Sequence, residues 1–222
     1  MHIPDGFINL PTSAGFGGVA VGGVWLSLRR AARLLDDRRI PLAGLAAAFV
    51  FAAQMINFPV AAGTSGHLIG GVLAAVLLGP WLGTVVLTVV LVIQGVFFAD
   101  GGLSALGLNI FNMAILSTLG GYAIFAGFLR WLPERRSTVV LAAGIAAGIS
   151  VVLAALGFSL QYLIGGEGGV GAGTVAGAMV GVHLLIGTGE GLITALIVGS
   201  VVKTRPDLVA GAASVGERTP GG

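Results

Sequence analysis

Long apolar stretches, separated by short polar segments, repeat along the chain of 222 residues. Because a helix needs about 20 apolar residues to cross a bilayer, this pattern predicts an all-α polytopic membrane protein with about seven spans. The third apolar stretch is too short for a full crossing. It follows an apolar segment rich in Gly and Pro, which predicts a loop that dips into the membrane and carries His67 below its surface. The predicted spans are residues 13–28, 41–58, 67–79, 81–98, 105–130, 138–163 and 173–202.

Composition supports a membrane protein. The chain is 56% hydrophobic and 9% charged, whereas a soluble domain carries about 25% charged residues. Its 39 glycines suit close helix packing in lipid, and the lack of cysteine excludes disulfides and thiolate metal sites. We expect one membrane domain over residues 1–205 and a disordered cytoplasmic tail over residues 206–222, where Pro, Gly, Ser and Thr are frequent.

The basic residues predict the orientation. All 11 Lys and Arg residues lie at or beyond the inner ends of the spans if the N-terminus is outside, and none lies in the outer segments 1–12, 59–66, 99–104 and 164–172. Cytoplasmic loops carry such an excess of positive charge. The pattern therefore predicts an outer N-terminus and a cytoplasmic C-terminus.

The first two residues, read together with a distant histidine, predict a metal site. The terminal amine of Met1, the peptide nitrogen of His2 and its imidazole can chelate one ion in two fused rings, and His67 can complete a plane of four nitrogens. That plane favours Ni(II) or Cu(II) over Zn(II), and Mg²⁺ and Ca²⁺ prefer oxygen ligands. Residues 1–13 lack the pattern of a signal peptide, so we expect Met1 to be the mature terminus, with its formyl group removed.

Polar residues inside spans are functional candidates, because their burial in lipid is costly. His183 and Glu190 are seven residues apart and share one helix face; they are either a coupling element near the metal or a tie between helices. Asn109 and Asn112, three residues apart, either hold the amino-terminal segment or join helices. The other candidates for the surroundings of the metal are Asp5, Asn57, Ser65 and Asp100.

The first span contains a possible docking surface. Ala14, Gly18 and Gly22 form a stripe of small residues, which lets another helix approach closely, either within the protein or from a partner. The chain contains no G-x-x-x-x-G-K-[ST] loop. The energy for transport against a gradient would therefore come from a partner or from an ion gradient.

Four motifs together carry a family resemblance: residues 1–7, 57–68, 98–109 and 183–194. They resemble the cobalt/nickel substrate-binding membrane subunits of energy-coupling factor (ECF) transporters, the CbiM/NikM family, and the resemblance extends from residue 1 to about residue 202. It implies a non-enzymatic substrate-binding component of an ABC transporter in a prokaryotic plasma membrane, which captures Ni(II) or Co(II) outside and delivers it inward.

The resemblance also implies ligands and partners. The ligands would be the Met1 amine, the His2 backbone nitrogen and imidazole, and the His67 imidazole, with the metal as transported substrate and no permanent cofactor. The partners would be a transmembrane coupling subunit, cytoplasmic ATPase subunits and a small auxiliary membrane subunit. The sequence leaves open whether the metal is nickel or cobalt, and whether it supplies cobalamin biosynthesis or nickel enzymes.

Two other classes of function stay open from the residues alone. One is a stand-alone proton-coupled metal carrier with His183 and Glu190 as the proton relay. The other is an intramembrane metalloenzyme with Glu190 as acid and base, although the chain contains no H-E-x-x-H motif.

Overall fold

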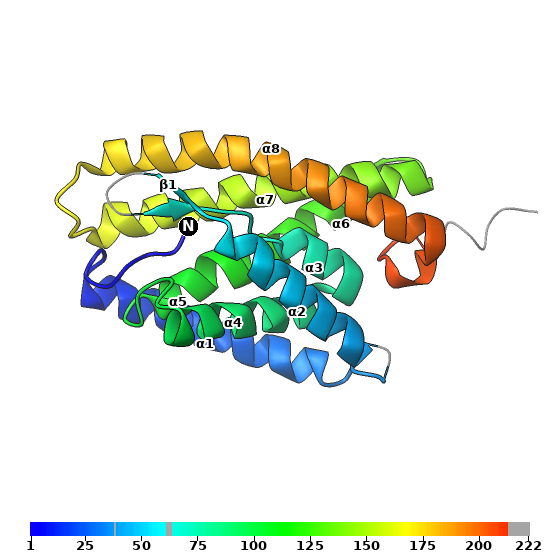
Figure 1. Ribbon diagram of the computed structural model, residues 1–222, viewed down its shortest axis with the longest axis horizontal. Coiled ribbons are helices and arrows are strands. Elements are labelled where there is room, and N and C mark those ends of the chain that lie inside the picture. The colour runs from blue at the N-terminus through cyan, green and yellow to red at the C-terminus, as the bar shows by residue number, and fades with distance from the viewer. Residues whose placement is uncertain (38, 61–63, 213–222) are drawn as a thin grey trace, which may run out of the picture.

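The computed structural model describes residues 1–37, 39–60 and 64–212, and shows a bundle of helices with one two-stranded sheet (Figure 1). Phe58–Pro59 (β1) pairs antiparallel with Ser65–Gly66 (β2). The helices are α1 (Leu10–Ala31), α2 (Arg39–Met55), α3 (Gly71–Leu78), α4 (Pro80–Phe97), α5 (Leu106–Asn109), the π-helix η1 (Ile110–Gly120), α6 (Gly121–Trp131), α7 (Arg136–Gly165), α8 (Ala172–Thr204) and the 3₁₀-helix η2 (Pro206–Leu208).

Four helical stretches are long and apolar enough to cross a membrane: α4, the continuous stretch α5–η1–α6, α7 and α8. The helix α2 is apolar but shorter. The helix α1 has 22 residues and begins after Asn9, whose side chain accepts a hydrogen bond from Thr12 N, the usual N-cap arrangement. Each of the seven predicted spans thus contains a helix, and four of these helices have the length and composition of a span.

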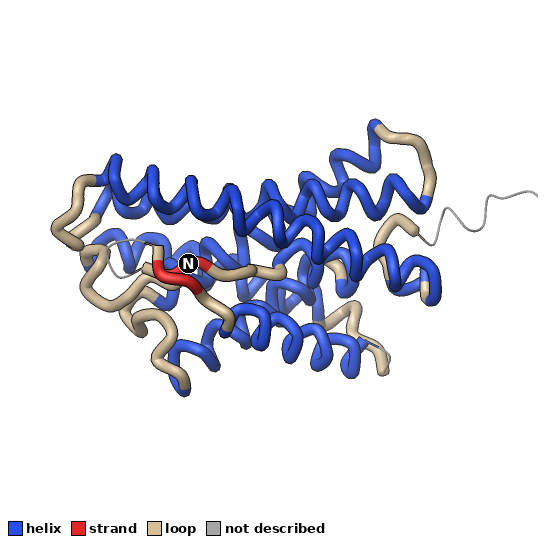
Figure 2. Tube along the Cα trace, turned by 45° about the horizontal axis from the view of Figure 1, so that its top comes forward, coloured by secondary structure: helices blue, strands red, loops and turns tan. Residues whose placement is uncertain are grey.

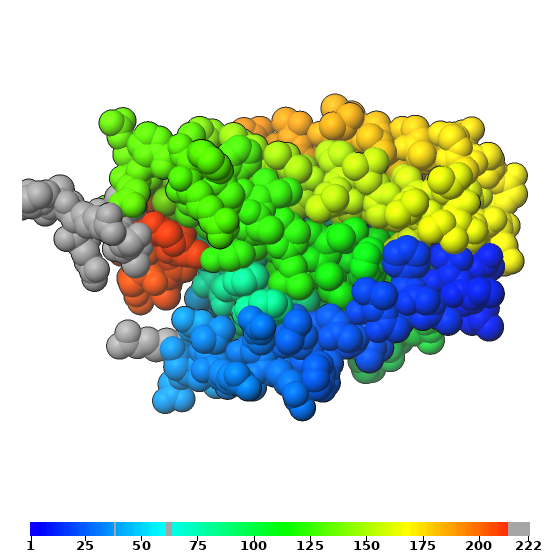
Figure 3. All heavy atoms as spheres, turned by 180° about the vertical axis from the view of Figure 1, so that it is seen from behind, coloured from blue at the N-terminus to red at the C-terminus, as the bar shows by residue number. Residues whose placement is uncertain are grey.

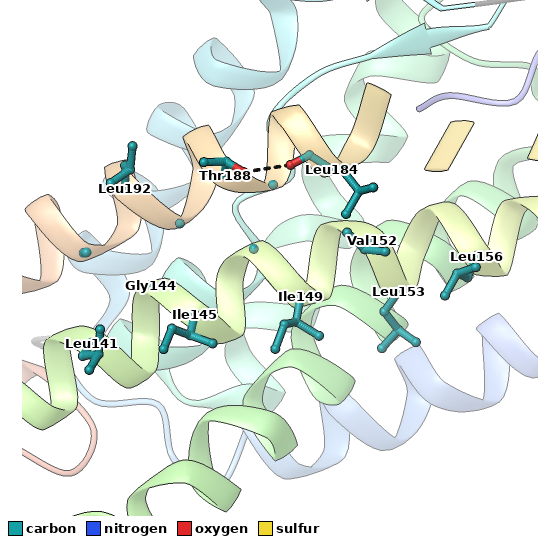
Figure 4. A pocket seen from close by; sticks show the side chains of 14 residues that line it. Leu141, Gly144, Ile145, Ile149, Val152, Leu153, Leu156, Leu184, Thr188 and Leu192 are labelled. Carbon is teal, nitrogen blue, oxygen red and sulfur yellow. Dashed lines mark hydrogen bonds between the residues drawn. The ribbon is translucent and has the colours of Figure 1, made fainter. Parts of the chain in front are cut away.

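Helices α7 and α8 lie side by side and cross at four glycines. A Cβ atom at Gly144 would lie 2.9 Å from the carbonyl oxygen of Gly191, and one at Gly187 would lie 2.7 Å from that of Gly148. Only glycine permits such close backbone contact. Figure 4 shows the groove over this crossing, lined mainly by Leu, Ile and Val; the one hydroxyl in it, that of Thr188, donates to the Leu184 carbonyl at 2.9 Å. The groove therefore offers no nitrogen ligands for a metal.

The short helix α3 is enclosed in the centre of the bundle, where all of its residues but Leu77 are buried. We predicted a third span from residue 67, but this helix begins only at Gly71. The preceding Gly70 has a left-handed φ of 79°, which ends the irregular chain before the helix. His67 therefore lies in a segment without regular secondary structure.

The packed part of the chain extends past residue 205, where we expected the tail to begin. After η2, Val209 and Ala212 are buried, and Ala210 N donates to the carbonyl of Val76 at 3.0 Å. This contact satisfies a carbonyl near the end of α3 that the helix itself leaves free. Residues 213–222 of the expected tail lie outside the described residues.

Candidate metal centre

The first three residues are buried inside the bundle. Met1 and Ile3 are 0% exposed and His2 is 4% exposed, and the N-terminus lies beside the two short strands (Figures 1 and 2). The side chain of Asn109 holds this segment: its Oδ1 accepts from Ile3 N at 2.8 Å, and its Nδ2 donates to the Ile3 carbonyl at 3.3 Å. Gly102 N donates to the same carbonyl at 2.8 Å. The amino terminus is thus fixed by hydrogen bonds to both the N–H and the carbonyl of Ile3.

Residues after Ile3 bond the segment to the loop after α4 and to the end of α7 and the loop that follows it. Asp5 Oδ1 accepts from the backbone and the hydroxyl of Ser104, and these bonds lower the pKa of Asp5. Asn9 N donates to the Gly165 carbonyl at 2.7 Å, and Glu167 N donates to the Phe7 carbonyl at 2.9 Å. Asp5 is exposed and contacts Ser104, so it anchors the loop after α4.

The rings of His2 and His67 face each other. His67 Nδ1 lies 2.8 Å from the carbonyl of Leu68. A carbonyl only accepts, so Nδ1 carries the ring proton and Nε2 presents a lone pair. That Nε2 lies 3.0 Å from Nδ1 of His2, and the ring centroids are 4.7 Å apart. Two imidazole nitrogens from residues 65 positions apart in the chain therefore lie next to each other.

The terminal amine lies in the same buried region. It is 3.4 Å from Ser65 Oγ in β2. Burial lowers the pKa of the Met1 amine from 8.0 to about 4, against a smaller opposing effect of Asp100. Burial, and next the charge of the amine, lower the pKa of His2 from 6.5 to about 3. Both groups are therefore unprotonated at neutral pH, as a nitrogen ligand must be.

The loop after α4 wraps around His2. Asp100 Oδ1 lies 3.2 Å from His2 Nδ1, and its Oδ2 is buried without a hydrogen bond. Burial raises the pKa of Asp100, and the nearby amine partly offsets this. Gly101 has φ 94°, and a Cβ atom there would lie 3.1 Å from His2 Cδ2. Glycine at this position lets the loop bring one carboxylate against the imidazole.

Gln94 is a neighbour of His2 that the sequence pattern did not single out. Its side chain in α4 is fully buried, its amide contacts the His2 ring, and neither amide atom has a hydrogen bond of normal geometry. His2 Nε2 is also buried without such a bond. The available signal was an amide within an apolar helix, two turns before Asp100.

The other predicted candidates divide into those near the site and those away from it. Glu190 accepts hydrogen bonds from Ile69 N and Gly70 N, beside His67. Nδ1 of His183 lies 2.7 Å from the carbonyl of Met179, and its Nε2 is buried without a hydrogen bond. Away from the site, Asn112 exchanges two hydrogen bonds with Gln161, at 2.8 and 3.0 Å, and Asn57 is exposed on the loop before β1. His183 and Glu190 therefore lie on one helix but bond to different groups.

Side chains alone do not make the centre. Among the described residues, no three His, Cys, Asp or Glu side chains gather in an arrangement that could hold a metal. The structure places His2 Nδ1 and His67 Nε2 3.0 Å apart, and the Met1 amine and the His2 backbone nitrogen are the main-chain nitrogens that could complete a set of four. Such a set can form two fused chelate rings plus one further bond, an arrangement suited to Ni(II) or Cu(II).

Comparisons with known proteins agree with this chemistry. The family described as CbiM, cobalt uptake substrate-specific transmembrane region, matches residues 2–208. A protein of Haloquadratum walsbyi, named for metal transport, is 41% identical, over 94% of this chain and 93% of its own. The fused nickel transport protein NikMN of Rhodobacter capsulatus is 36% identical, over 95% of this chain and 64% of its own. The cobalt transport protein CbiM of Sorangium cellulosum is 34% identical, over 94% of each.

A solved structure supports the same relationship. A crystal structure described as that of a transition metal transporter is 33% identical, covers 91% of this chain and 93% of its own chain, and superimposes with a TM-score of 0.84. The resemblance drawn from the sequence is thereby confirmed. The chain belongs to the CbiM/NikM family of cobalt and nickel transport membrane proteins.

Proposed function

We propose that this protein captures one Ni(II) or Co(II) ion from outside the cell through four nitrogens: the Met1 amine, the His2 backbone nitrogen, His2 Nδ1 and His67 Nε2. The observation that carries the proposal is the 3.0 Å separation of His2 Nδ1 and His67 Nε2, beside a buried, unprotonated amine. With metal–nitrogen bonds of about 2.0 Å, neighbouring ligands in a square plane lie about 2.8 Å apart. The two rings therefore already stand close to the spacing of adjacent ligands.

Charge supports a divalent cargo. A divalent ion bound to one deprotonated backbone nitrogen leaves a net charge of +1 in a buried site, and an uncompensated buried charge is costly. Asp100, 3.2 Å from His2 Nδ1, supplies the opposite charge. Asp100 thereby balances the complex without occupying a position in the plane of nitrogens.

We assign the protein to the substrate-binding component of an ECF transporter in a prokaryotic plasma membrane. Its coupling subunit, ATPase subunits and auxiliary subunit would supply the work of inward release, because tight binding implies slow spontaneous release. The stripe Ala14, Gly18 and Gly22 is the proposed docking surface. All three residues are exposed, a Cβ atom at Gly18 or Gly22 would meet nothing within 4 Å, and α1 runs along the surface in Figure 3.

Equilibrium binding to the purified protein tests the metal site. His2→Ala and His67→Ala are each expected to lose most Ni(II) and Co(II) binding, measured by calorimetry, whereas His183→Ala keeps it. If His183→Ala loses the metal and His67→Ala binds it fully, His183 rather than His67 is the ligand, and the proposal is refuted.

Transport by reconstituted protein distinguishes the subunit from a stand-alone carrier. Glu190 already binds two backbone N–H groups, which favours a structural role over a proton relay. We expect no Ni(II) uptake into proteoliposomes without ATPase partners. Uptake that follows a proton gradient in their absence would contradict the subunit assignment.

A further inference from the structure

The segment that carries His67 is held from two sides by buried polar side chains. From α8, Glu190 accepts from Ile69 N at 2.5 Å through Oε2 and from Gly70 N at 2.9 Å through Oε1. From α2, the amide of Gln54 donates to the carbonyl of Ile69 at 2.8 Å. Glu190 is 2% exposed and Gln54 is 0% exposed. Two helices thus fix one peptide, two residues after His67.

The backbone of this segment requires hydrogen-bond partners from other helices. Residues 67–70 have no regular secondary structure, so Ile69 N and Gly70 N, which precede the first residue of α3, have no helical acceptor. A free N–H group within a bilayer costs several kcal/mol. A carboxylate satisfies both groups at once, at the helix end where negative charge is favoured.

We propose that Glu190 is the positioning residue of His67. It fixes the peptides of Ile69 and Gly70, and the Leu68 carbonyl fixes the ring through Nδ1, so that Nε2 stands 3.0 Å from His2 Nδ1. This inference rests on the proposed role of His67 as a metal ligand. Without the carboxylate, the segment rearranges to find other partners for its N–H groups, and the imidazole leaves the plane of nitrogens.

A pair of buried side chains that only stabilises the packing of helices would not affect metal binding when it is broken. The chain contains such a pair, which serves as a matched control. Asn112 and Gln161 also form two buried hydrogen bonds, between η1 and α7, and their bonds do not involve residues 67–70. Breaking either pair is expected to lower Tm. Only the loss of Glu190 is expected to change the atoms that bind the metal.

The experiment uses Cu(II) as a spectroscopic probe and Ni(II) for affinity, with the full-length protein in detergent. The wild type is expected to give the visible absorption and electron paramagnetic resonance of four nitrogen ligands, and His67→Ala those of three nitrogens and one oxygen from water. Glu190→Ala is expected to show the His67→Ala spectrum, with Ni(II) affinity at least about 100-fold weaker than in the wild type, as for the loss of a direct ligand. Glu190→Gln, which keeps one acceptor oxygen, is expected to lie between them. Gln161→Ala is expected to keep the wild-type spectrum and affinity despite a lower Tm.

The outcomes separate this inference from the proposed function. A four-nitrogen spectrum in Glu190→Ala, when His67→Ala has lost it, overturns the role of Glu190 and leaves the metal site intact. If Glu190→Ala does not fold, a wild-type spectrum and affinity in Glu190→Gln overturn it equally. A four-nitrogen spectrum in His67→Ala itself refutes the proposed site.

Discussion

The position of the Met1 amine allows a sharp test by extension of the chain. Met1 is 0% exposed, and its amine lies 3.4 Å from Ser65 Oγ. Three added residues, Gly-Ser-Gly, span up to about 10 Å, so they carry the new amine away from the site and convert the Met1 nitrogen into a peptide nitrogen. Three residues are better than one, because a single addition would place His2 third in the chain, where an amine, two backbone nitrogens and an imidazole can chelate without His67.

The expected loss of affinity is large. Removal of a group that only supports a ligand typically weakens metal binding 10- to 100-fold, so the loss of a direct ligand is expected to exceed about 100-fold, or about 3 kcal/mol. The site is also adapted to a neutral amine. A pKa lowered from 8.0 to about 4 corresponds to about 5 kcal/mol against a protonated amine in this position. In the proposed site, protons at the amine would therefore compete little with the metal at neutral pH.

Calorimetry with Ni(II) and the Cu(II) spectrum measure this effect. The extended protein is expected to lose tight Ni(II) binding and the four-nitrogen spectrum, whereas the same three residues added after Gly222 change neither. An extended protein with wild-type affinity and spectrum would refute the participation of the amine, and with it the proposed chelate.

Three further predictions follow from the site and the charges. Between pH 4 and pH 8 the unfolded chain binds a proton at the Met1 amine that the folded chain does not. The Tm of the metal-free protein is therefore expected to rise with pH over this range. A rise of the same size in the protein extended by Gly-Ser-Gly would contradict the role of the Met1 amine in this pH dependence. Asp100→Asn is expected to weaken Ni(II) binding about 10-fold while it keeps the four-nitrogen Cu(II) spectrum, and an unchanged affinity would contradict charge balance. In this cysteine-free chain, Glu167→Cys is expected to react with an impermeant thiol reagent added outside and Ser137→Cys is not; the opposite labelling would reverse the orientation.

The sequence predicted the helical segments because long apolar stretches require backbone bonds within the segment. It also singled out His2 and His67, since histidine is rare in the chain, with 3 in 222 residues. The exact start of α3 depends on the left-handed backbone of Gly70, which no apolar pattern records. The partners of Glu190 lie about 120 positions away in sequence, so only the packing of α8 against the His67 segment could reveal them.

The structure places the two imidazoles on separately anchored segments. The first three residues are held by Asn109 and Gly102, whereas the His67 segment is held by Glu190 and Gln54. The contact of His2 Nδ1 with His67 Nε2 crosses the boundary between these segments. A bond about 2 Å long tolerates little displacement, so a small movement of one segment relative to the other would be enough to open the proposed chelate. If the proposed site holds, release of the ion would require neither segment to unfold, and a partner that tilts α1, which directly follows the first nine residues, would act on one side of the site while α8 retains the other.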